Sequence, residues 1–358
     1  MKIVQVIPSL AYGDAIGNDT LAIRDILLEQ GYETELYAEN VLKPLAPSIA
    51  RPVSELSKLK KQDIALYHLS TGTELNFEIA KLNCKKVAIY HNVTPPHYFA
   101  RTNDVIRKIN EWALEGVRFL ADKLDYCLAV SDYNKEELIK MGYRCPIDVI
   151  PIIIPFDDYK KSPDNNIMKQ YRDGKTNILF TGRVVPNKKQ EDVIKAFYYY
   201  KKYYNDHARL IILGSCANDP AYVKKLQLYA ETLGVKDVHF TGHIKFNEIL
   251  AFYRIADLFL CMSEHEGFCV PLVEAMFFDI PIVARATSAI PYTLGGSGIL
   301  LPDQDALAAA GMLHYLNTHE ELKRQVVEGQ RIRLEAFAYD KVKEQFLQSI
   351  RVITGEQK

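Results

Sequence analysis

Residues 1–37 read MKIVQVIPSLAYGDAIGNDTLAIRDILLEQGYETELY and set the pattern on which the rest of the chain is built. Lys2–Ile7 is a β-branched run ended by Pro8, and it is typical of a short buried strand. A glycine-containing loop follows, and residues 20–30 then carry apolar side chains at helical spacing. Residues 33–37 predict the next strand, so the chain opens with a strand–helix–strand unit.

The same alternation continues through the first half of the chain. A helix is predicted over residues 103–124, and a second helix is predicted to begin after Ser131, whose hydroxyl can cap it. The predicted strands lie at residues 64–67, 86–90, 126–130 and 148–150. Repeated strand–helix alternation favours a mostly parallel sheet with helices on both of its faces.

Residues 151–175 interrupt this rhythm with a polar, turn-rich stretch, which we interpret as a domain junction. The alternation then restarts, with strands expected at 177–181, 210–213, 238–240, 258–260, 282–284 and 298–301. Helices are expected at about 190–204 and 320–353, the second with a bend near Ala338–Tyr339. The prediction is an α/β protein of two doubly wound, Rossmann-like domains, residues 1–155 and 156–335. The helix of residues 336–358 is expected to cross back to the first domain. In such sheets ligands bind at the carboxyl ends of the strands, so both domains are expected to face one cleft.

Bulk properties exclude several classes of protein. The chain has 358 residues, a net charge of -1 and 48% hydrophobic residues, which is the mix of a water-soluble globular protein without a strong overall field toward nucleic acid. The six cysteines form no C-x-x-C pair and favour buried reduced thiols in a cytoplasmic protein. The N-terminus lacks a signal-peptide pattern, and no apolar stretch reaches the roughly 20 residues of a membrane helix.

The segment with the most chemistry is SEHEGFCVPLVEAM, residues 263–276, between a predicted strand and a predicted helix. Glu266 lies in its loop, and Glu274 lies in the first turns of the helix. Carboxylates accept paired hydrogen bonds from the neighbouring hydroxyls of a ribose or a hexose. Amides at a helix start suit a diphosphate. The alternative is two solvated acids on either side of a helix start.

A second candidate segment is TGRVVPNKKQE, residues 181–191, which also joins a strand to a helix. Arg183 and Lys188 can both reach one anion there. Two cations at a helix N-terminus oppose the helix dipole, which is unfavourable unless an anion such as a diphosphate binds. The alternative is a pair of ordinary surface cations, as we expect for Lys189.

Three further features are weaker signals. Gly13 and Gly17, in the loop after the first strand, permit close backbone approach to a ligand but lack the G-x-G-x-x-G spacing. His91 follows a predicted strand, where cleft residues belong, although a lone histidine is more often structural. The pair Asp303 and Asp305 matches a D-x-D metal motif, but we expect it to cap the next helix and assign no metal.

At these residues the chain resembles the retaining family-4 glycosyltransferases of the GT-B fold. The E-x7-E element of that family is similar to Glu266 and Glu274, and its G-R-x4-K signature is similar to Gly182, Arg183 and Lys188. The resemblance runs from the first predicted strand to the last helix. It is closer to a bacterial subgroup that builds O-antigen, capsule and exopolysaccharide, several members of which are mannosyltransferases. The strings that carry it are GDAIGND, YHLSTGTEL, YHNVTPPHYF, NKKQEDVIKAF, SEHEGFCVPLVEAM and TLGGSGILL.

The resemblance implies roles for the residues that match the family motifs. Arg183 and Lys188 would neutralise the donor diphosphate, Glu274 would hold the ribose, and Glu266 would contact the transferred hexose. His91 would line the reaction centre near the anomeric carbon. The remaining positions would contact the ligand mainly through backbone: Phe268, Cys269 and Val270 at phosphate or sugar, Ile244 near the base, and Gly13 and Gly17 in a loop that closes over donor and acceptor. Many family members have glycine at position 269.

The implied activity is a retaining, metal-independent transfer of a mannose- or glucose-type hexose. The donor would be a GDP- or UDP-sugar, which serves as co-substrate with no other cofactor. The acceptor would be a glycan or a lipid-linked oligosaccharide in surface polysaccharide biosynthesis, with no nucleic acid as partner. Two alternatives stay open: a sugar-nucleotide epimerase of the same fold, and a non-catalytic subunit that binds a nucleotide-sugar.

A lipid-linked acceptor implies a cytoplasmic protein with peripheral contact to the inner membrane face. The sequence supports this contact only through basic residues around an amphipathic stretch that contains Trp112, namely Arg101, Arg107, Lys108, Arg118 and Lys123. The alternative for this stretch is an ordinary helix that faces the core.

Overall fold

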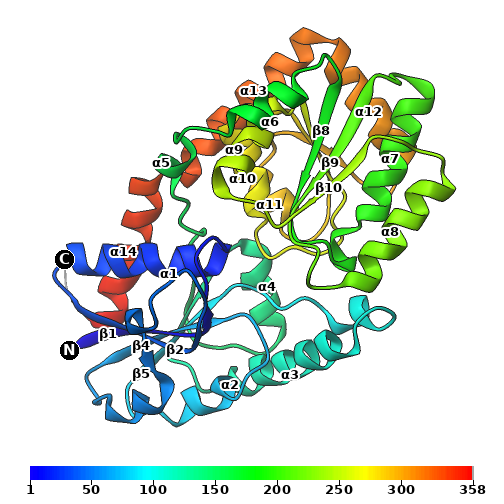
Figure 1. The fold of residues 1–358 in the computed structure, drawn as a ribbon. Helices are drawn as coiled ribbons and strands as arrows, with labels where there is room; N and C mark the ends of the chain where they lie inside the picture. The colour runs from blue at the N-terminus through cyan, green and yellow to red at the C-terminus, as the bar shows by residue number, and fades with distance from the viewer. Residues whose placement is uncertain (357–358) are drawn as a thin grey trace. The chain divides into compact units, whose positions relative to one another are not determined.

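The computed structural model describes residues 1–356 and divides them into two compact units. Unit 1 contains Met1–His97, Val105–Pro155 and the C-terminal residues from Phe337 onward, and unit 2 contains Tyr98–Asp104 and Phe156–Ala336. Each unit is a parallel α/β sheet with helices on both faces, which confirms the predicted pair of Rossmann-like domains (Figure 1). The predicted shared cleft concerns the placement of one unit against the other and stays a prediction.

The sheet of unit 1 contains seven strands, and every pairing in it is parallel. Their bounds are β1 Lys2–Leu10, β2 Glu33–Val41, β3 Arg51–Pro52, β4 Ile64–Leu69, β5 Lys85–Tyr90, β6 Tyr126–Ala129 and β7 Ile147–Val149. The spatial order is β3-β2-β1-β4-β5-β6-β7, so the first strand lies inside the sheet. All six residues of β4 are buried, as expected for a central strand covered on both faces.

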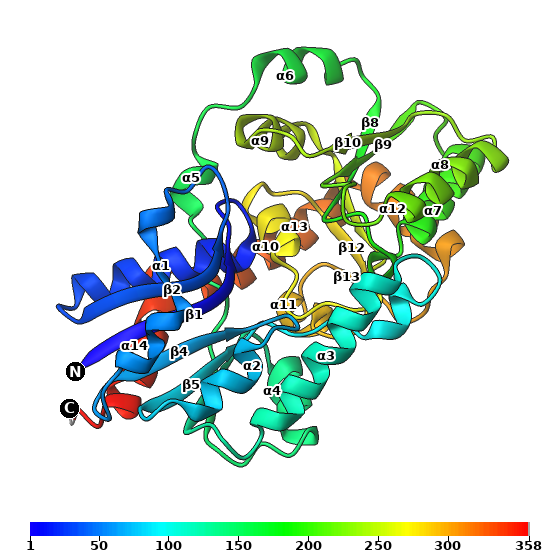
Figure 2. The ribbon, with the colours of Figure 1, turned by 60° about the horizontal axis from the view of Figure 1, so that its bottom comes forward.

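Helices cover both faces of this sheet. Figures 1 and 2 place α1 and α14 on one side and α2, α3 and α4 on the other. Their bounds are α1 Ala15–Glu29, α2 Leu75–Glu78, α3 Asp104–Leu120, α4 Asp132–Lys140 and α14 Tyr339–Thr354, with short 3₁₀ turns η1 Pro47–Ile49, η2 Val53–Lys58, η3 Ile79–Lys81 and η4 Pro96–Phe99. The Ser131 hydroxyl accepts the Asn134 N–H, which confirms the predicted cap of α4.

The C-terminal helix α14 belongs to unit 1 although it follows unit 2 in the chain. The Lys343 ammonium lies against the Glu29 carboxylate of α1. The Ser349 hydroxyl donates to the Asp148 carboxylate at 2.5 Å, and Phe346, Ile350 and Ile353 are buried. The helix therefore completes the hydrophobic core of the first unit.

The sheet of unit 2 has six parallel strands in the order β10-β9-β8-β11-β12-β13. Their bounds are β8 Thr176–Thr181, β9 Ala208–Leu213, β10 Val238–Gly242, β11 Leu258–Cys261, β12 Ile282–Arg285 and β13 Ile299–Leu301. The helices are α5 Phe156–Tyr159, α6 Asn165–Tyr171, α7 Gln190–Tyr203, α8 Pro220–Thr232, α9 Phe246–Ile255, α10 Val270–Phe277, α11 Ile290–Leu294, α12 Ala306–Thr318 and α13 Glu320–Leu334, with 3₁₀ turns η5 Pro186–Lys188 and η6 Glu335–Phe337.

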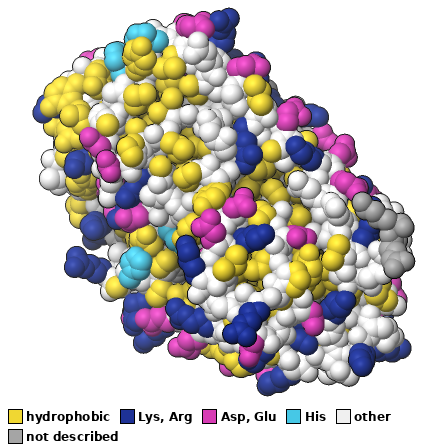
Figure 3. Space-filling view, turned by 180° about the vertical axis from the view of Figure 1, so that it is seen from behind, with side chains coloured by type: hydrophobic (Ala, Val, Ile, Leu, Met, Phe, Trp, Pro, Cys, Tyr) yellow, Lys and Arg dark blue, Asp and Glu magenta, His cyan; other side chains and the backbone are white. Residues whose placement is uncertain are grey.

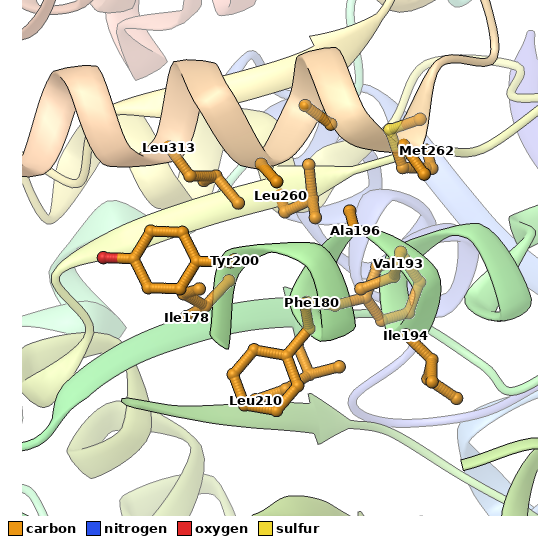
Figure 4. Packing of buried hydrophobic residues seen from close by; sticks show 14 of the residues in the cluster. Ile178, Phe180, Val193, Ile194, Ala196, Tyr200, Leu210, Leu260, Met262 and Leu313 are labelled. Atoms are coloured by element: carbon orange, nitrogen blue, oxygen red, sulfur yellow. The ribbon is translucent and has the colours of Figure 1, made fainter. Parts of the chain in front are cut away.

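The core of unit 2 is made where α7 and α12 pack on the sheet. Phe180 of β8 and Leu210 of β9 belong to one buried cluster with Val193 and Tyr200 of α7. Leu313 of α12 belongs to the same cluster (Figure 4). These side chains are 0–1% exposed, so the strand ends above them are held by a close-packed interior. Asp305 caps α12 by accepting two backbone N–H groups, which confirms the capping role predicted for the D-x-D pair.

Two local predictions were wrong, and one was confirmed. Strand β1 runs through Pro8 to Leu10, because the pairing register with β2 passes over the proline, which lacks an N–H. The stretch 151–175 is not all turns, since α5 and α6 lie in it and Asp164 caps α6. The bend predicted near Ala338 is confirmed, because η6 ends the first helix of the last helical stretch and Ala338, with an extended ψ of 134°, precedes α14.

No helix within residues 1–356 combines the length and the apolar character that a membrane crossing requires. Lys, Arg, Asp and Glu side chains are mixed on the face shown in Figure 3, as the net charge of -1 suggests. All six cysteines are free thiols.

Candidate functional site

The loop after β8 carries the first group of predicted site residues. The Gly182 N–H donates to the Leu213 carbonyl at 2.9 Å, which joins this loop to the end of β9. A Cβ atom at Gly214 would lie 2.1 Å from the Gly182 carbonyl oxygen, so this close crossing of two backbones requires glycine. The crossing fixes the point from which Arg183 projects, and the Gln190 side chain donates to the Arg183 carbonyl at 2.9 Å.

Arg183 is exposed, and its guanidinium makes no hydrogen bond or ion pair with any part of the chain that the structure describes. It lies in the loop that leads from β8 to η5, seven residues before the first residue of α7. An exposed cation without a partner adds little to the stability of the domain. The arrangement suits an anionic ligand.

Lys188, which ends η5, points instead into the loop after β11. Its ammonium forms an ion pair with the Glu266 carboxylate, and these side chains are 16% and 7% exposed. Asn187 makes a second link between the two loops, because its side chain donates to the His265 carbonyl at 3.0 Å. The Glu264 N–H donates to the Asn187 carbonyl at 2.8 Å. The two segments that the sequence analysis selected therefore lie together.

Lys189 is not a free surface cation. It has a left-handed backbone at φ 53°, and its ammonium lies 3.1 Å from the Glu264 carboxylate. The same carboxylate lies 3.5 Å from Arg285. These contacts add to the ties between the loops after β8 and β11, so Lys189 has a structural role that the sequence analysis did not assign.

The roles predicted for the backbone at Phe268, Cys269 and Val270 stay predictions, but the structure defines the start of α10. Cys269 is the N-cap residue and has a left-handed φ of 72°. Pro271 has no N–H, and the Leu272 N–H donates to the Cys269 carbonyl at 3.0 Å. Val270 is therefore the first-turn position whose N–H the helix itself does not use. Phe268 is buried, and its carbonyl accepts the Thr293 hydroxyl.

Glu274 lies in the second turn of α10 and is held by two tyrosines. The Tyr159 hydroxyl donates to one of its carboxylate oxygens at 2.9 Å, and the Tyr253 hydroxyl donates to the other. Burial raises the pKa of Glu274 above its usual value, although both hydroxyl groups favour the ionised form. A carboxylate has about four acceptor positions, so two remain for further donors.

Ile244 lies in the loop between β10 and α9 and is partly buried. Gly242, at the end of β10, has a φ of 68° and forms an isolated bridge with Gly214. The end of β10 is thus next to the end of β9, which is itself joined to Gly182. Within the described residues no hydrogen bond joins Ile244 to Arg183 or Glu266, so its predicted role at the base stays a prediction.

In unit 1, the prediction for Gly17 was wrong in one respect. Gly17 is not in the loop but in the first turn of α1, where its N–H donates to the capping Asp14 at 2.6 Å. A Cβ atom there would lie 1.7 Å from the Ala11 carbonyl oxygen, so glycine is needed for packing. Gly13 is in the loop, has a φ of 90°, and donates its N–H to the Asn18 side chain at 3.0 Å.

His91 follows β5, as predicted, and ends a buried chain of hydrogen bonds. The Gln5 side-chain N–H donates to the Thr20 carbonyl at 3.0 Å, so the Gln5 Oε1 atom faces Nε2 of His68 at 2.9 Å and accepts its proton. Burial lowers the pKa of His68 well below its usual value, so its Nδ1 carries a lone pair. Nε2 of His91, 2.9 Å away, must then donate to that lone pair.

The tautomer of His91 follows from this chain. Burial lowers the pKa of His91 to about 3, so the ring is neutral and its Nδ1 atom is an acceptor. That atom is buried and has no hydrogen-bond partner within the described chain. The Asp19 carboxyl group lies near the two histidine rings and accepts the Ile153 N–H at 2.9 Å. Burial raises the pKa of Asp19 to about 7. His91 is thus an uncharged acceptor at the carboxyl end of the sheet.

Two groups of side chains in the described chain offer ligand atoms within 4.8 Å of one another. One consists of Asp19, His68 and His91, and the other of Cys261, Glu266 and Cys269. The carboxylates already have partners of their own, the Ile153 N–H for Asp19 and the Lys188 ammonium for Glu266. The absence of a metal requirement stays a prediction.

One comparison with known proteins concerns unit 2. Residues 164–333 match the family model described as "Glycosyl transferases group 1". The match covers just under half of the chain, and we call the matched segment the group 1 domain. The matched residues contain Arg183, Lys188, Glu266 and Glu274.

The alignments with related proteins cover different shares of this chain. An uncharacterized 41.2 kDa protein in the cps region of Klebsiella pneumoniae is 24% identical over 330 residues, 84% of this chain and 86% of its own length. A D-inositol 3-phosphate glycosyltransferase of Xylanimonas cellulosilytica is 27% identical over 168 residues. That alignment covers 46% of this chain and 39% of the relative, so the chain spans well under half of that protein.

The fold of the whole chain is similar to solved structures. Anabaena HepE in complex with UDP and glucose has a TM-score of 0.76 at 18% identity, over 98% of this chain and all of that one. Sucrose-phosphate synthase of Thermosynechococcus elongatus has the same TM-score at 16% identity, with both chains fully covered. At these identities the likeness shows the two-domain fold.

Several side chains around the group 1 domain's candidate site and around His91 were missed from the sequence. They are the ones that hold the predicted residues in place. Tyr159 and Tyr253 bind Glu274, and the Ser288 hydroxyl accepts the Glu266 N–H. Asn187 binds the His265 carbonyl, and Gln5 and Thr20 contact His68 next to His91. Each lies far along the chain from the residue it supports, and none forms a motif with it. A buried polar residue inside a strand, such as Gln5, is the one signal that could have been noticed.

Proposed function

We propose that the protein is a retaining glycosyltransferase that moves a mannose- or glucose-type hexose from a GDP- or UDP-sugar to a glycan or lipid-linked oligosaccharide in surface polysaccharide biosynthesis. The observation that carries the proposal is the junction of the loops after β8 and β11 within a group 1 domain. It places an unpaired cation, Arg183, on the loop that also bears the Lys188–Glu266 pair.

In this proposal Arg183 and Lys188 stabilise the negative charge that develops on the leaving diphosphate. When the bond from the sugar to the diphosphate breaks, negative charge grows on the leaving oxygen. Arg183 offers a bidentate guanidinium for a phosphate. The Lys188 ammonium has three N–H donors and can keep one on Glu266 while another reaches the phosphate. Fixed donors of this kind stabilise a transition state without reorganising, so the proposal needs no metal ion.

In this proposal the carboxylates of Glu274 and Glu266 bind the hydroxyl groups of the donor. Glu274 has acceptor positions left for the two ribose hydroxyls, and the hydroxyls of Tyr159 and Tyr253 keep it in one orientation. Glu266 would meet the hexose, and the neutral His91 would accept a hydrogen bond from a substrate hydroxyl. The relative from the cps region of Klebsiella pneumoniae supports a role in polysaccharide assembly. Peripheral contact with the cytoplasmic membrane face is part of the same proposal.

Donor identity is tested by thermal unfolding with UDP, GDP, ADP and the corresponding nucleotide-sugars. Ligand that binds only the native state raises its stability by about 2.7 kcal/mol at 100 times the Kd, so the matching nucleotide raises the Tm most. Incubation of that donor with a lipid-linked acceptor should then lengthen the acceptor by one hexose. No shift with any nucleotide would refute the proposal.

The two alternative functions give different outcomes in the same reactions. An epimerase would isomerise the donor sugar with no acceptor present. A non-catalytic binding subunit would show the thermal shift but neither isomerised sugar nor lengthened acceptor. Mass and sugar analysis of the products therefore separates the three.

A further inference from the structure

Two cysteines of unit 1, Cys127 and Cys145, lie with their sulfur atoms 3.6 Å apart. Cys127 is in β6, and Cys145 lies just before β7. The Cys127 N–H donates to the Pro146 carbonyl at 2.9 Å, which holds the two segments side by side. A disulfide bond is about 2.05 Å long, so the sulfur atoms need to approach by roughly 1.5 Å.

The two thiols differ in reactivity. Cys127 is fully buried, whereas Cys145 is partly exposed. The hydrogen bond between the sulfur atoms lowers the pKa of Cys145 and raises that of Cys127. Thiolates, not thiols, react with oxidants, so Cys145 is the thiol that solvent can reach and that ionises more easily.

We propose that Cys127 and Cys145 form an oxidation site, at which a peroxide converts the dithiol into a disulfide. The Cys145 thiolate attacks the peroxide O–O bond, giving a sulfenic acid at Cys145 and releasing water after proton transfer. The Cys127 sulfur then attacks the Cys145 sulfur, the S–O bond breaks, and a second water leaves. In total two thiols and one hydrogen peroxide give one disulfide and two waters.

The loop that this bond would close contains helix α4, which supports the residues on either side of His91. The Asn134 side chain donates to the Tyr90 carbonyl at 3.2 Å and accepts from the Asn92 side chain at 2.8 Å. Glu137 accepts from the Tyr90 hydroxyl at 2.6 Å and from the Asn92 side chain at 2.9 Å. Oxidation would therefore constrain the helix that positions the end of β5. The bond forms whether or not the chain transfers a sugar, so the inference goes beyond the proposed function.

The test is a peptide map of the folded full-length chain after treatment with a few equivalents of hydrogen peroxide. Remaining thiols are alkylated after unfolding, and the digest is analysed by mass without reduction. We expect one linked pair of peptides, containing Cys127 and Cys145 and lacking two hydrogens. The Cys145→Ser variant should lose this species, and the oxidised native protein should melt at a higher temperature than the reduced form.

The second cysteine pair of the chain is the matched control. Cys261 and Cys269 also lie close together but are both buried, so they should stay reduced and be alkylated after unfolding. The proposal is overturned if Cys127 and Cys145 are both recovered alkylated, or if Cys145 is oxidised to a sulfinic acid without a link. A link from Cys145 to any other cysteine would overturn it as well.

Discussion

Arg183, in the loop after β8, is an exposed cation whose guanidinium makes no hydrogen bond or ion pair with residues 1–356. The other cations of its loop are paired, Lys188 with Glu266 and Lys189 with Glu264. A surface cation without a partner adds little to stability. Its place in the domain is therefore better explained by a ligand than by folding.

Replacing Arg183 with alanine should weaken binding of the matching nucleoside diphosphate about 10- to 100-fold, the worth of a charged hydrogen-bonded contact. The free energy of unfolding should change by no more than about 0.5 kcal/mol, because the side chain is exposed and unpaired. Calorimetric titration measures the first and urea unfolding the second.

The matched control is Lys195→Ala, which removes the same charge from an exposed position on α7. It should leave the affinity unchanged. Equal weakening in both variants would mean that the nucleotide responds to total charge, and Arg183 would lose its assignment.

A second residue-scale prediction concerns Asp19, whose pKa burial raises from 3.8 to about 7. The folded chain keeps this proton as pH rises from 4 to 7, whereas the unfolded chain releases it. The group therefore lowers the free energy of unfolding by about 1.4 kcal/mol per pH unit across that window. Asn at this position keeps the acceptor for the Ile153 N–H but cannot ionise.

The stability of Asp19→Asn relative to the native protein should therefore rise between pH 5 and 7 and level off above. Urea unfolding at pH 5, 6, 7 and 8 measures this difference. His68 and His91, with pKa values lowered by burial, contribute the opposite slope below about pH 6.5 in both proteins and so cancel. Parallel pH profiles for the two proteins would contradict the assignment.

At the scale of elements, the strand and helix alternation was predictable because apolar periodicity and glycine punctuation are local. The exact starts of the helices could not be predicted in the same way, and α1 is an example. The string GDAIGND looks like a flexible loop, but Asp14 caps the helix at once and Gly17 is buried against Ala11. The contact that requires glycine at 17 lies between a helix and the end of a strand, which periodicity does not report.

Gly17→Ala should destabilise unit 1 by about 1–3 kcal/mol, because the added methyl meets the Ala11 carbonyl and backbone must shift. Gly329→Ala is the opposite case. This glycine lies within α13, no atom lies within 4 Å of its Cβ position, and alanine should stabilise by about 0.5–1 kcal/mol. Thermal unfolding of both variants checks the signs, and a stable Gly17→Ala protein would count against the packing role.

The junction of the loops after β8 and β11 gives the next prediction. Lys188→Met alone leaves the Glu266 carboxylate with little exposure and no cation, which should cost about 3 kcal/mol of unfolding free energy. Glu266→Gln alone should also lower the free energy of unfolding. The double variant should lose less than the sum of the two, with a coupling of about 1–3 kcal/mol. Strictly additive effects would show that the ion pair does not tie the loops together.

For the whole molecule, the two Rossmann-like domains could be predicted because the alternation occurs twice and is interrupted once. The return of α14 to unit 1 rests on separate contacts such as Lys343 with Glu29. The parts of the candidate sites that come from distant segments could not be predicted. Tyr159 and Tyr253 converge on Glu274 from two other helices, and Gln5 acts on His91 through His68. Such convergence is a property of the fold and leaves no spacing in the sequence.

The most direct test of the central claim is the transfer rate of Glu274→Ala with the nucleotide-sugar that binds the native protein. Our account predicts that the variant folds, as judged by its circular dichroism, and that its kcat/KM for the donor falls at least about 100-fold, or roughly 2.7 kcal/mol. A folded Glu274→Ala protein with native transfer activity would contradict the placement of the donor at the loop after β11 and helix α10.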